Sequence, residues 1–193
     1  MAVTFILALS LFCVPARGAE EPETRRIDIK KPVAYSFGGM AVGLPLLMAA
    51  GTFDSGPSLN NFTGAFKSAP VWENDSPVFN YVLHPLWGSE TYLRAREANW
   101  GIPGSIAFTL GMSFTWEYLI ESWVEHPSTQ DLIFTTGIGW MIGEVRYALK
   151  QRTSENWHWV IDPINTTLDH LKVHIGRNAK GQNEVMFALS WKF

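Results

Sequence analysis

Residues 113–123 read Ser113-Phe-Thr-Trp-Glu117-Tyr-Leu-Ile-Glu121-Ser-Trp123, an apolar and aromatic stretch with two carboxylates four residues apart. In a helix this spacing separates the two side chains by only about 40° around the axis, so Glu117 and Glu121 leave the same face. Two like charges on one face repel, and burial among apolar residues adds to the cost. We therefore expect a helix whose acidic face meets a cation, a proton, a metal ion or water inside the protein.

The composition of the chain favours a membrane or membrane-surface protein. Hydrophobic residues make up 47% of the 193 residues, nine residues are Trp, and only 17% are charged. Ordinary soluble proteins contain roughly 25% charged residues. The formal net charge of -3 offers no basic surface for a polyanion, so we expect no nucleic-acid partner.

The first 18 residues have the features of a secretory signal peptide. Residues 1–15 form an apolar run too short to span a bilayer comfortably, and the small-x-small cleavage pattern Ala16-Arg17-Gly18 follows it. The alternative is a retained N-terminal anchor. With cleavage, Cys13 is removed and the mature chain has no thiol. Residues 19–31 are charged and predict a flexible lead-in.

Several apolar segments in residues 32–170 predict a mainly α fold in which three to four helices pack together and associate with a membrane. Gly and Pro interrupt the segments, which cover residues 32–51, 85–99, 104–123 and 129–150. Ser128-Thr-Gln-Asp131 has the spacing of a capping box and starts the last of them. Residues 52–76 are rich in Gly, Pro, Ser and Asn and predict a long loop.

Small residues recur at helical spacing in two of these segments. Gly39 and Gly43 form one pair, and Gly137, Gly139 and Gly143 form a second set. Faces of this kind let two helices approach closely. We expect close helix contacts at both places.

In residues 171–193 the strongest apolar residues alternate with other residues, which is the period of a β-strand and predicts a C-terminal β-hairpin. In its second strand the large apolar residues fall on one face: Val185, Phe187, Leu189, Trp191 and Phe193. This strand resembles the terminal strand of bacterial outer-membrane proteins, which implies the barrel-assembly machinery as a partner. One hairpin cannot close a barrel, because small bacterial barrels need about eight strands. The alternative is an ordinary amphipathic edge strand.

Charged and polar residues stand inside otherwise apolar segments, where an unpaired charge costs several kcal/mol. Each is therefore a candidate functional position: Asp75, His84, Arg94, Arg96, Glu117, Glu121, Asp131, Glu144 and Arg146. We expect a charge network of Arg94, Arg96, Asp131, Glu144 and Arg146.

An ordered set of motifs over residues 70–148 resembles an uncharacterised bacterial envelope family known as a domain of unknown function. The motifs are Asn80-Tyr-Val-Leu-His84-Pro-Leu-Trp-Gly88-Ser89 with Tyr92 and Ala95-Arg96, Trp116-Glu117 with Glu121, Pro127-Ser-Thr-Gln-Asp131, Thr135, and Gly143-Glu144. The order His, Glu, Ser-x-x-Asp and a glycine-rich helix is also faintly similar to VanZ-like membrane proteins. Neither resemblance brings an established activity.

Three interpretations of the polar residues remain open. In the first, the arginines neutralise the glutamates in a buried network, and the protein has a structural or assembly role. In the second, it is a lipid-modifying hydrolase in which His84, Glu117 and Glu121 are catalytic, since close carboxylates can work as acid and base. Ser89 and Ser113 are the available hydroxyl nucleophiles, although neither stands in a nucleophile elbow.

The third interpretation is a metal site built from His84, Glu117, Glu121 and Asp131. Their spacing lacks His-x-x-x-His and Glu-x-x-His, so we expect no metal and no cofactor. The sequence leaves open whether the protein is an enzyme. It predicts an exported protein of the cell envelope, at the periplasmic side of the outer membrane, with membrane lipid as a partner.

Overall fold

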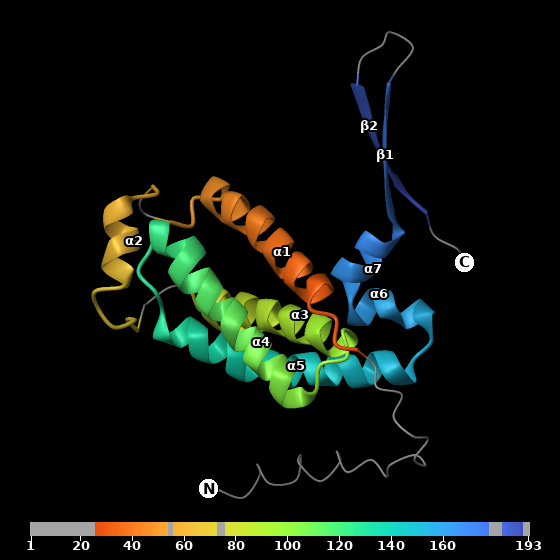
Figure 1. Ribbon diagram of the computed structural model, residues 1–193, viewed down its shortest axis with the longest axis horizontal. Helices are drawn as coiled ribbons and strands as arrows, with labels where there is room; N and C mark the ends of the chain where they lie inside the picture. The colour runs from red at the N-terminus through yellow and green to blue at the C-terminus, as the bar shows by residue number, and fades with distance from the viewer. Residues whose placement is uncertain (1–25, 54–55, 73–75, 178–182, 191–193) are drawn as a thin grey trace, which may run out of the picture.

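The computed structural model describes residues 26–53, 56–72, 76–177 and 183–190. It is mainly helical and ends in an antiparallel hairpin, so the predicted fold class is confirmed (Figure 1). The predicted signal peptide, residues 19–25 of the lead-in, Asp75, Trp191 and Phe193 lie outside the described residues. The elements are α1 (Lys30–Ala49), α2 (Leu59–Ala65), α3 (His84–Glu97), α4 (Ile102–Thr115), α5 (Thr129–Arg152), α6 (His158–Ile161), α7 (Pro163–His170), β1 (Leu171–Arg177) and β2 (Asn183–Leu189).

The backbones of α3 and α5 touch at glycines. A Cβ atom on Gly88 would lie 1.8 Å from the Thr135 carbonyl oxygen, and one on Gly139 would lie 2.8 Å from the Gly88 Cα. One on Gly143 would lie 2.6 Å from the Tyr92 ring. The predicted close contact is therefore confirmed for Gly139 and Gly143. Successive residues of α3 meet successive residues of α5, so the two helices run in the same direction.

Gly137 differs from its neighbours, because no other side chain or helix lies within 4 Å of a Cβ placed there. The prediction of a close contact is wrong at this residue. Gly137 and Gly139 lie about 200° apart around a helix, so one faces α3 while the other faces away.

Two tryptophan rings pack on the glycine face of α1. A Cβ atom on Gly39 would lie 2.4 Å from the Trp87 ring, and one on Gly43 would lie 3.9 Å from the Trp116 ring. The small residues of α1 therefore make room for indole rings rather than for another helix backbone. Among the described residues, α1 alone is long and apolar enough to cross a bilayer, on length and composition.

The helix that holds His84 begins earlier than the sequence indicates. Residues 77–97 are continuously helical, and Phe79–Leu83 form a π-helical turn in which the His84 N–H bonds to the Phe79 carbonyl five residues back. The physical reason lies in Pro85, which has no N–H to donate and whose ring would collide with the carbonyl four residues earlier in a regular α-helix. The wider π turn relieves that collision, and such turns often mark functional sites.

A second π-helical turn, Trp116–Ile120, follows α4. Its last bond joins the Glu121 N–H to the Trp116 carbonyl, and a 3₁₀ turn, Glu121–Trp123, comes next. The stretch that carries Glu117 and Glu121 is thus not a regular α-helix. The angular separation expected for the two glutamates does not apply to it.

The predicted loop of residues 52–76 contains a helix that the sequence pattern did not indicate. The Ser58 hydroxyl caps α2 by accepting a hydrogen bond from the Asn60 N–H at 3.1 Å. Phe62 of α2 stacks on Trp123 with the ring centroids 4.6 Å apart. The helix has only 7 residues, which is too short for its periodicity to be recognised in the sequence.

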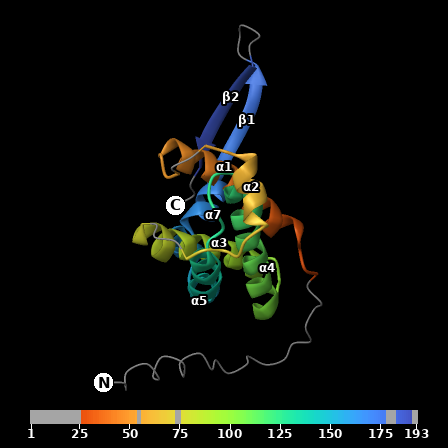
Figure 2. The same cartoon turned by 90° about the vertical axis from the view of Figure 1, so that its left-hand side faces the viewer.

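The hairpin extends away from the helices in both views (Figures 1 and 2). Its register pairs Leu171 with Leu189 and Ile175 with Val185. Ile175 is 80% exposed. The described strands therefore pair with each other and present apolar side chains to the surroundings.

The interior of the helical part contains many polar side chains, and many large apolar side chains are exposed on its surface. Small hydroxyl side chains are buried: Ser36, Ser89, Thr91, Ser105, Thr109, Ser113, Ser122 and Thr135. Large apolar side chains are exposed on α1, α4 and α5: Phe37, Val42, Leu46, Leu110, Phe114, Ile133, Met141 and Leu149. Where such side chains form a contiguous patch, they usually mark a contact with membrane or protein.

We expect Gly139→Ala to destabilise the protein, because its methyl group would collide with the backbone of α3. Overpacking of this kind costs about 1–3 kcal/mol. Denaturant unfolding of detergent-solubilised protein, followed by circular dichroism, measures the change. The matched control is Gly137→Ala, which should be neutral or stabilising because alanine favours helix by up to about 1 kcal/mol. Equal stability of the two variants would contradict the α3–α5 contact.

Candidate functional site

His84, Glu117 and Asp131 come together from three elements. His84 follows the first π turn, Glu117 lies in the second, and Asp131 lies in the first turn of α5. One nitrogen or oxygen of each side chain lies within 4.8 Å of those of the other two. Glu117 and Asp131 are buried, and His84 is partly exposed. We call these three residues the His84 site.

The start of α5 explains how Asp131 reaches this site. The Ser128 hydroxyl caps the helix and accepts a hydrogen bond from the Asp131 N–H at 3.2 Å, as the capping box predicts. In a capping box the N–H of the capping residue bonds to the side chain three residues later. Here the Ser128 N–H instead donates to Glu117 Oε2 at 2.8 Å. Glu117 therefore takes the capping role that the spacing assigns to the Asp131 carboxylate. The Asp131 carboxylate instead lies 3.4 Å from His84 Nε2.

The other ring nitrogen of His84 is also held. Nδ1 lies 3.2 Å from the hydroxyl of Thr135, one turn further along α5 and buried. Two contacts with α5 thus fix the plane of the imidazole ring. Both depend on the close packing of α3 against α5.

Glu121 lies outside the His84 site within the described chain. It is half-buried in the 3₁₀ turn, where its carbonyl accepts hydrogen bonds from the N–H groups of Val124 and Glu125. Glu117 and Asp131 each place a carboxylate oxygen within 4.8 Å of a His84 ring nitrogen. The catalytic role predicted for Glu121 stays a prediction.

A cavity of about 270 Å³ reaches His84 from the side of α1. Its walls are apolar apart from the imidazole and come from α1 and the two π-turn regions, including Gly43, Leu47, Phe79, Trp87 and Trp116. The indole N–H of Trp87 is buried and has no acceptor among the described residues. The His84 site therefore adjoins an apolar pocket through the imidazole ring of His84.

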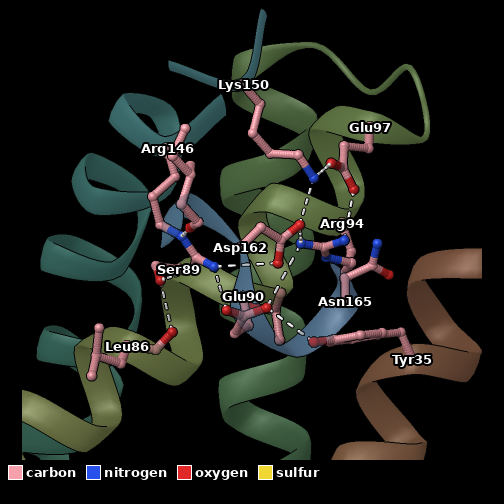
Figure 3. Close-up of polar contacts among 12 residues, drawn as sticks. Tyr35, Leu86, Ser89, Glu90, Arg94, Glu97, Arg146, Lys150, Asp162 and Asn165 are labelled. Atoms are coloured by element: carbon pink, nitrogen blue, oxygen red, sulfur yellow. Dashed lines mark hydrogen bonds and ion pairs between the residues drawn. The ribbon is translucent and has the colours of Figure 1, made fainter. Parts of the chain in front are cut away.

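A separate cluster of charges joins α3 and α5 to the segment between α6 and α7 (Figure 3). We call it the arginine cluster, and its members are Glu90, Arg94, Glu97, Arg146, Lys150 and Asp162. Three cations face three carboxylates in it. The formal charges cancel, which is the condition for burying such groups at tolerable cost.

Asp162 is the centre of the arginine cluster and is fully buried. It accepts hydrogen bonds from the Arg94 guanidinium, from Lys150 Nζ at 2.5 Å and from Arg146 at 3.4 Å. Burial raises the pKa of this carboxyl, but the hydrogen bonds and charges of Arg94 and Lys150 outweigh it, so the pKa lies below the ordinary value. Asp162 is therefore charged near neutral pH.

The two glutamates of α3 complete the cluster. Glu97 accepts from Lys150 Nζ at 2.5 Å and pairs with Arg94 at 2.8 Å. Glu90 accepts from Arg146 at 2.5 Å and from the Tyr35 hydroxyl of α1 at 3.0 Å. The cluster thus links four parts of the chain.

Arg96 and Glu144 form a smaller pair beside the cluster. Arg96 Nε donates to Glu144 Oε2 at 2.8 Å, and the same oxygen accepts from the Tyr92 hydroxyl at 2.8 Å. The Arg96 guanidinium also lies over the Tyr147 ring, 4.3 Å from its centroid. This pair is a second local link between α3 and α5.

The residues of the predicted charge network therefore fall in three places. Arg94 and Arg146 lie in the arginine cluster, Arg96 and Glu144 form their own pair, and Asp131 belongs to the His84 site. Sequence reasoning missed four members of the cluster: Glu90, Glu97, Lys150 and Asp162. The i,i+4 and i,i+3 spacings of Glu90 and Glu97 from Arg94 are the signal that could have found two of them.

The two candidate hydroxyl nucleophiles have different surroundings. The Ser89 hydroxyl donates to the Leu86 carbonyl and accepts from Arg146 at 2.7 Å, which ties it to the arginine cluster. The Ser113 hydroxyl is buried without a hydrogen-bond partner among the described residues. Ser89 is thus engaged with the Leu86 carbonyl and with Arg146.

Comparison with known proteins gives one match. Residues 69–168 match the family described as Domain of unknown function (DUF3943). The matched region contains the His84 site and all members of the arginine cluster. No curated protein and no solved structure matches the chain.

The lowered pKa of Asp162 predicts how stability depends on pH. The ordinary pKa is 3.8, and the folded value lies below it, so the stabilisation is complete above the ordinary pKa and is lost as the pH falls through the folded pKa. Acid unfolding should therefore be less steep in Asp162→Asn, which should also cost about 3–5 kcal/mol at neutral pH. Asp169→Asn, at an exposed aspartate of α7, is the control and should cost little stability at neutral pH. An unchanged profile in Asp162→Asn would contradict the assignment.

Proposed function

The chain belongs to the DUF3943 family, whose function is unknown, and we propose that it is a membrane-associated hydrolase of the cell envelope that acts on a lipid. The observation that carries the proposal is the position of His84. Its imidazole contacts the Asp131 carboxylate and also forms part of the wall of an apolar cavity. A polar reactive group at the end of an apolar pocket is the usual arrangement of a site for an amphiphilic ligand.

The pocket supports an acyl chain as the part of the substrate that is bound. Its walls are apolar side chains and two indole rings. Glycines of α1 also line it, and their lack of a side chain leaves room for the cavity. Its volume of about 270 Å³ is near the lower end of ligand sites, roughly 300–1,000 Å³. One chain rather than a whole lipid fits such a volume, which leaves the head group near His84.

The chemistry that suits this geometry is hydrolysis of an acyl ester by water. A water molecule is held by the carboxylates and the imidazole. It loses a proton to one of these side chains as its oxygen bonds to the acyl carbon. The ester C–O bond then breaks, and the proton passes to the departing alkoxide. The products are a carboxylic acid and an alcohol.

The surface of the helical part supports membrane association. Exposed apolar side chains occur on α1, α4 and α5, and α1 has the length and composition of a membrane span. The sequence features of a signal peptide favour the envelope as the location. A lipid substrate would then be available where the protein resides.

The test is hydrolysis of acyl esters and phospholipids by purified protein in mixed micelles, with release of fatty acid measured by mass spectrometry. We expect Glu117→Gln to lower the rate at least about 100-fold, as loss of an acid–base group does. Glu155→Gln, at an exposed glutamate far along the chain, should keep the wild-type rate. Folding of each variant is checked by circular dichroism.

A second pair of variants tests the pocket. Gly43→Leu places a side chain toward the Trp116 ring and into the cavity, whereas Gly38→Leu lies on the same helix with no neighbour within 4 Å. We expect Gly43→Leu to raise KM for long-chain esters and Gly38→Leu to leave it unchanged. Hydrolysis that is absent from folded wild-type protein on every acyl ester tested would refute the proposal.

A structural or assembly role is the second candidate, and the exposed hairpin favours it. Each strand has one unpaired edge along its described length, and such edges can add a strand from another protein. The charge-balanced arginine cluster would then act as a rigid base for the hairpin. In this case the partner is the barrel-assembly machinery, reached through the last strand.

Deletion of Phe193 tests this location and partner. The residue ends the alternating apolar face that resembles an assembly signal, so we expect less protein in the outer-membrane fraction after cell fractionation. Substitution of Lys192 by Gln, on the opposite face by alternation, is the control. Unchanged fractionation of the deletion variant would count against the outer-membrane address.

A further inference from the structure

We propose that His84, Glu117 and Asp131 bind one divalent transition-metal ion of the Zn²⁺ class. The inference deepens the proposed function and rests on it for the role of the ion, although binding itself can be tested alone. The three side chains offer one nitrogen and two carboxylate oxygens within 4.8 Å of one another. Mixed imidazole and carboxylate ligands suit Zn²⁺ and its neighbours, whereas Mg²⁺ and Ca²⁺ prefer oxygen alone.

The surroundings of the ligands resemble the outer shell of a metal site. Thr135 Oγ1 lies 3.2 Å from His84 Nδ1, which leaves Nε2 directed toward the Asp131 carboxylate. The Ser128 N–H donates to one oxygen of Glu117 at 2.8 Å. Metal-binding histidines and carboxylates are commonly oriented by such partners, which fix the tautomer and the ring plane.

Charge also favours a cation at this place. Glu117 and Asp131 are each at most 3% exposed, and their oxygens lie close together. A divalent ion with a neutral imidazole balances both carboxylates, just as three cations balance three carboxylates in the arginine cluster. Buried carboxylates would then be neutralised by cations in both places, by a metal ion in the His84 site and by arginine and lysine in the arginine cluster.

The backbone departs from regular α-helix at two points beside the His84 site. Both π turns of the described chain adjoin it, since His84 follows one and Glu117 lies in the other. Each π turn shifts the following side chains relative to a regular helix. The ligands therefore converge although their sequence spacing lacks a metal-binding motif.

The cavity that His84 lines would give an exchangeable ligand access to the ion. It reaches His84 from α1, so substrate and ion would meet at the end of the pocket. When bound, such an ion supplies Lewis-acid polarisation of a carbonyl oxygen. Three protein ligands and an open position are the pattern of catalytic rather than structural zinc sites.

The experiment uses the full chain in detergent, stripped with a chelator and titrated separately with Zn²⁺, Mn²⁺ and Mg²⁺ by calorimetry. Visible absorption of the Co²⁺ form reports the coordination. We expect one equivalent of Zn²⁺ to bind, and we expect His84→Gln and Asp131→Asn each to weaken binding at least tenfold. The control is His158→Gln, at a histidine bonded to the Lys150 carbonyl, which should bind as wild type does.

Three results would overturn the metal site: no saturable binding to folded wild-type protein, binding that His84→Gln and Asp131→Asn both retain, or binding of Mg²⁺ alone. Circular dichroism identifies variants that fail to fold. For these, a rise in the melting temperature of wild type with Zn²⁺ but not with Mg²⁺ is the deciding measurement. Ester hydrolysis that persists in metal-free protein refutes the role of the ion in the reaction and supports the hydrolase, whereas tight Zn²⁺ binding without hydrolysis supports the metal site and refutes the hydrolase.

Discussion

The approach of α3 to α5 at Gly88 and Gly139 is the constraint on which the rest of the structure depends. At this distance no side chain fits between the two backbones. The helices are consequently held in one register, which places His84 against Asp131 and Thr135 at one end and Glu97 against Lys150 at the other. A shift of one turn would separate the members of both sites at once.

The two polar sites use this register for different purposes. The arginine cluster is balanced within itself and ties the segment around Asp162 to the bundle, so its contribution is to stability and to the placement of the hairpin. The His84 site lies beside a cavity and combines a partly exposed imidazole with two buried carboxylates. A buried charge-balanced network needs nothing from outside, whereas groups at the wall of a pocket are available to a ligand. The proposals for chemistry therefore concern the second site.

Much of the fold was predictable because its signals are local. The start of α5 at Ser128, the contact at Gly139 and the C-terminal hairpin follow from caps, small residues and alternation. The π turns were not predictable from periodicity, since a single extra residue per turn leaves little trace in an apolar segment. The sequence grouped His84, Glu117, Glu121 and Asp131 as possible ligands, but it could not show that Asp131 rather than Glu121 joins Glu117, because this depends on the return of α5 to the end of α4. Asp162 gave no signal, because its partners lie 12 to 68 residues away in the sequence.

The most direct test of the α3–α5 contact is a nuclear Overhauser effect between the Hα protons of Gly88 and Gly139. Selective glycine labelling of the protein in detergent isolates the few peaks concerned. Because a Cβ on Gly139 would lie 2.8 Å from the Gly88 Cα, the two pairs of protons must be close, and a strong cross-peak is expected. Sequential cross-peaks within each helix, together with no cross-peak between these glycines, would show that the helices do not meet there, and the geometry of both polar sites would fall with that contact.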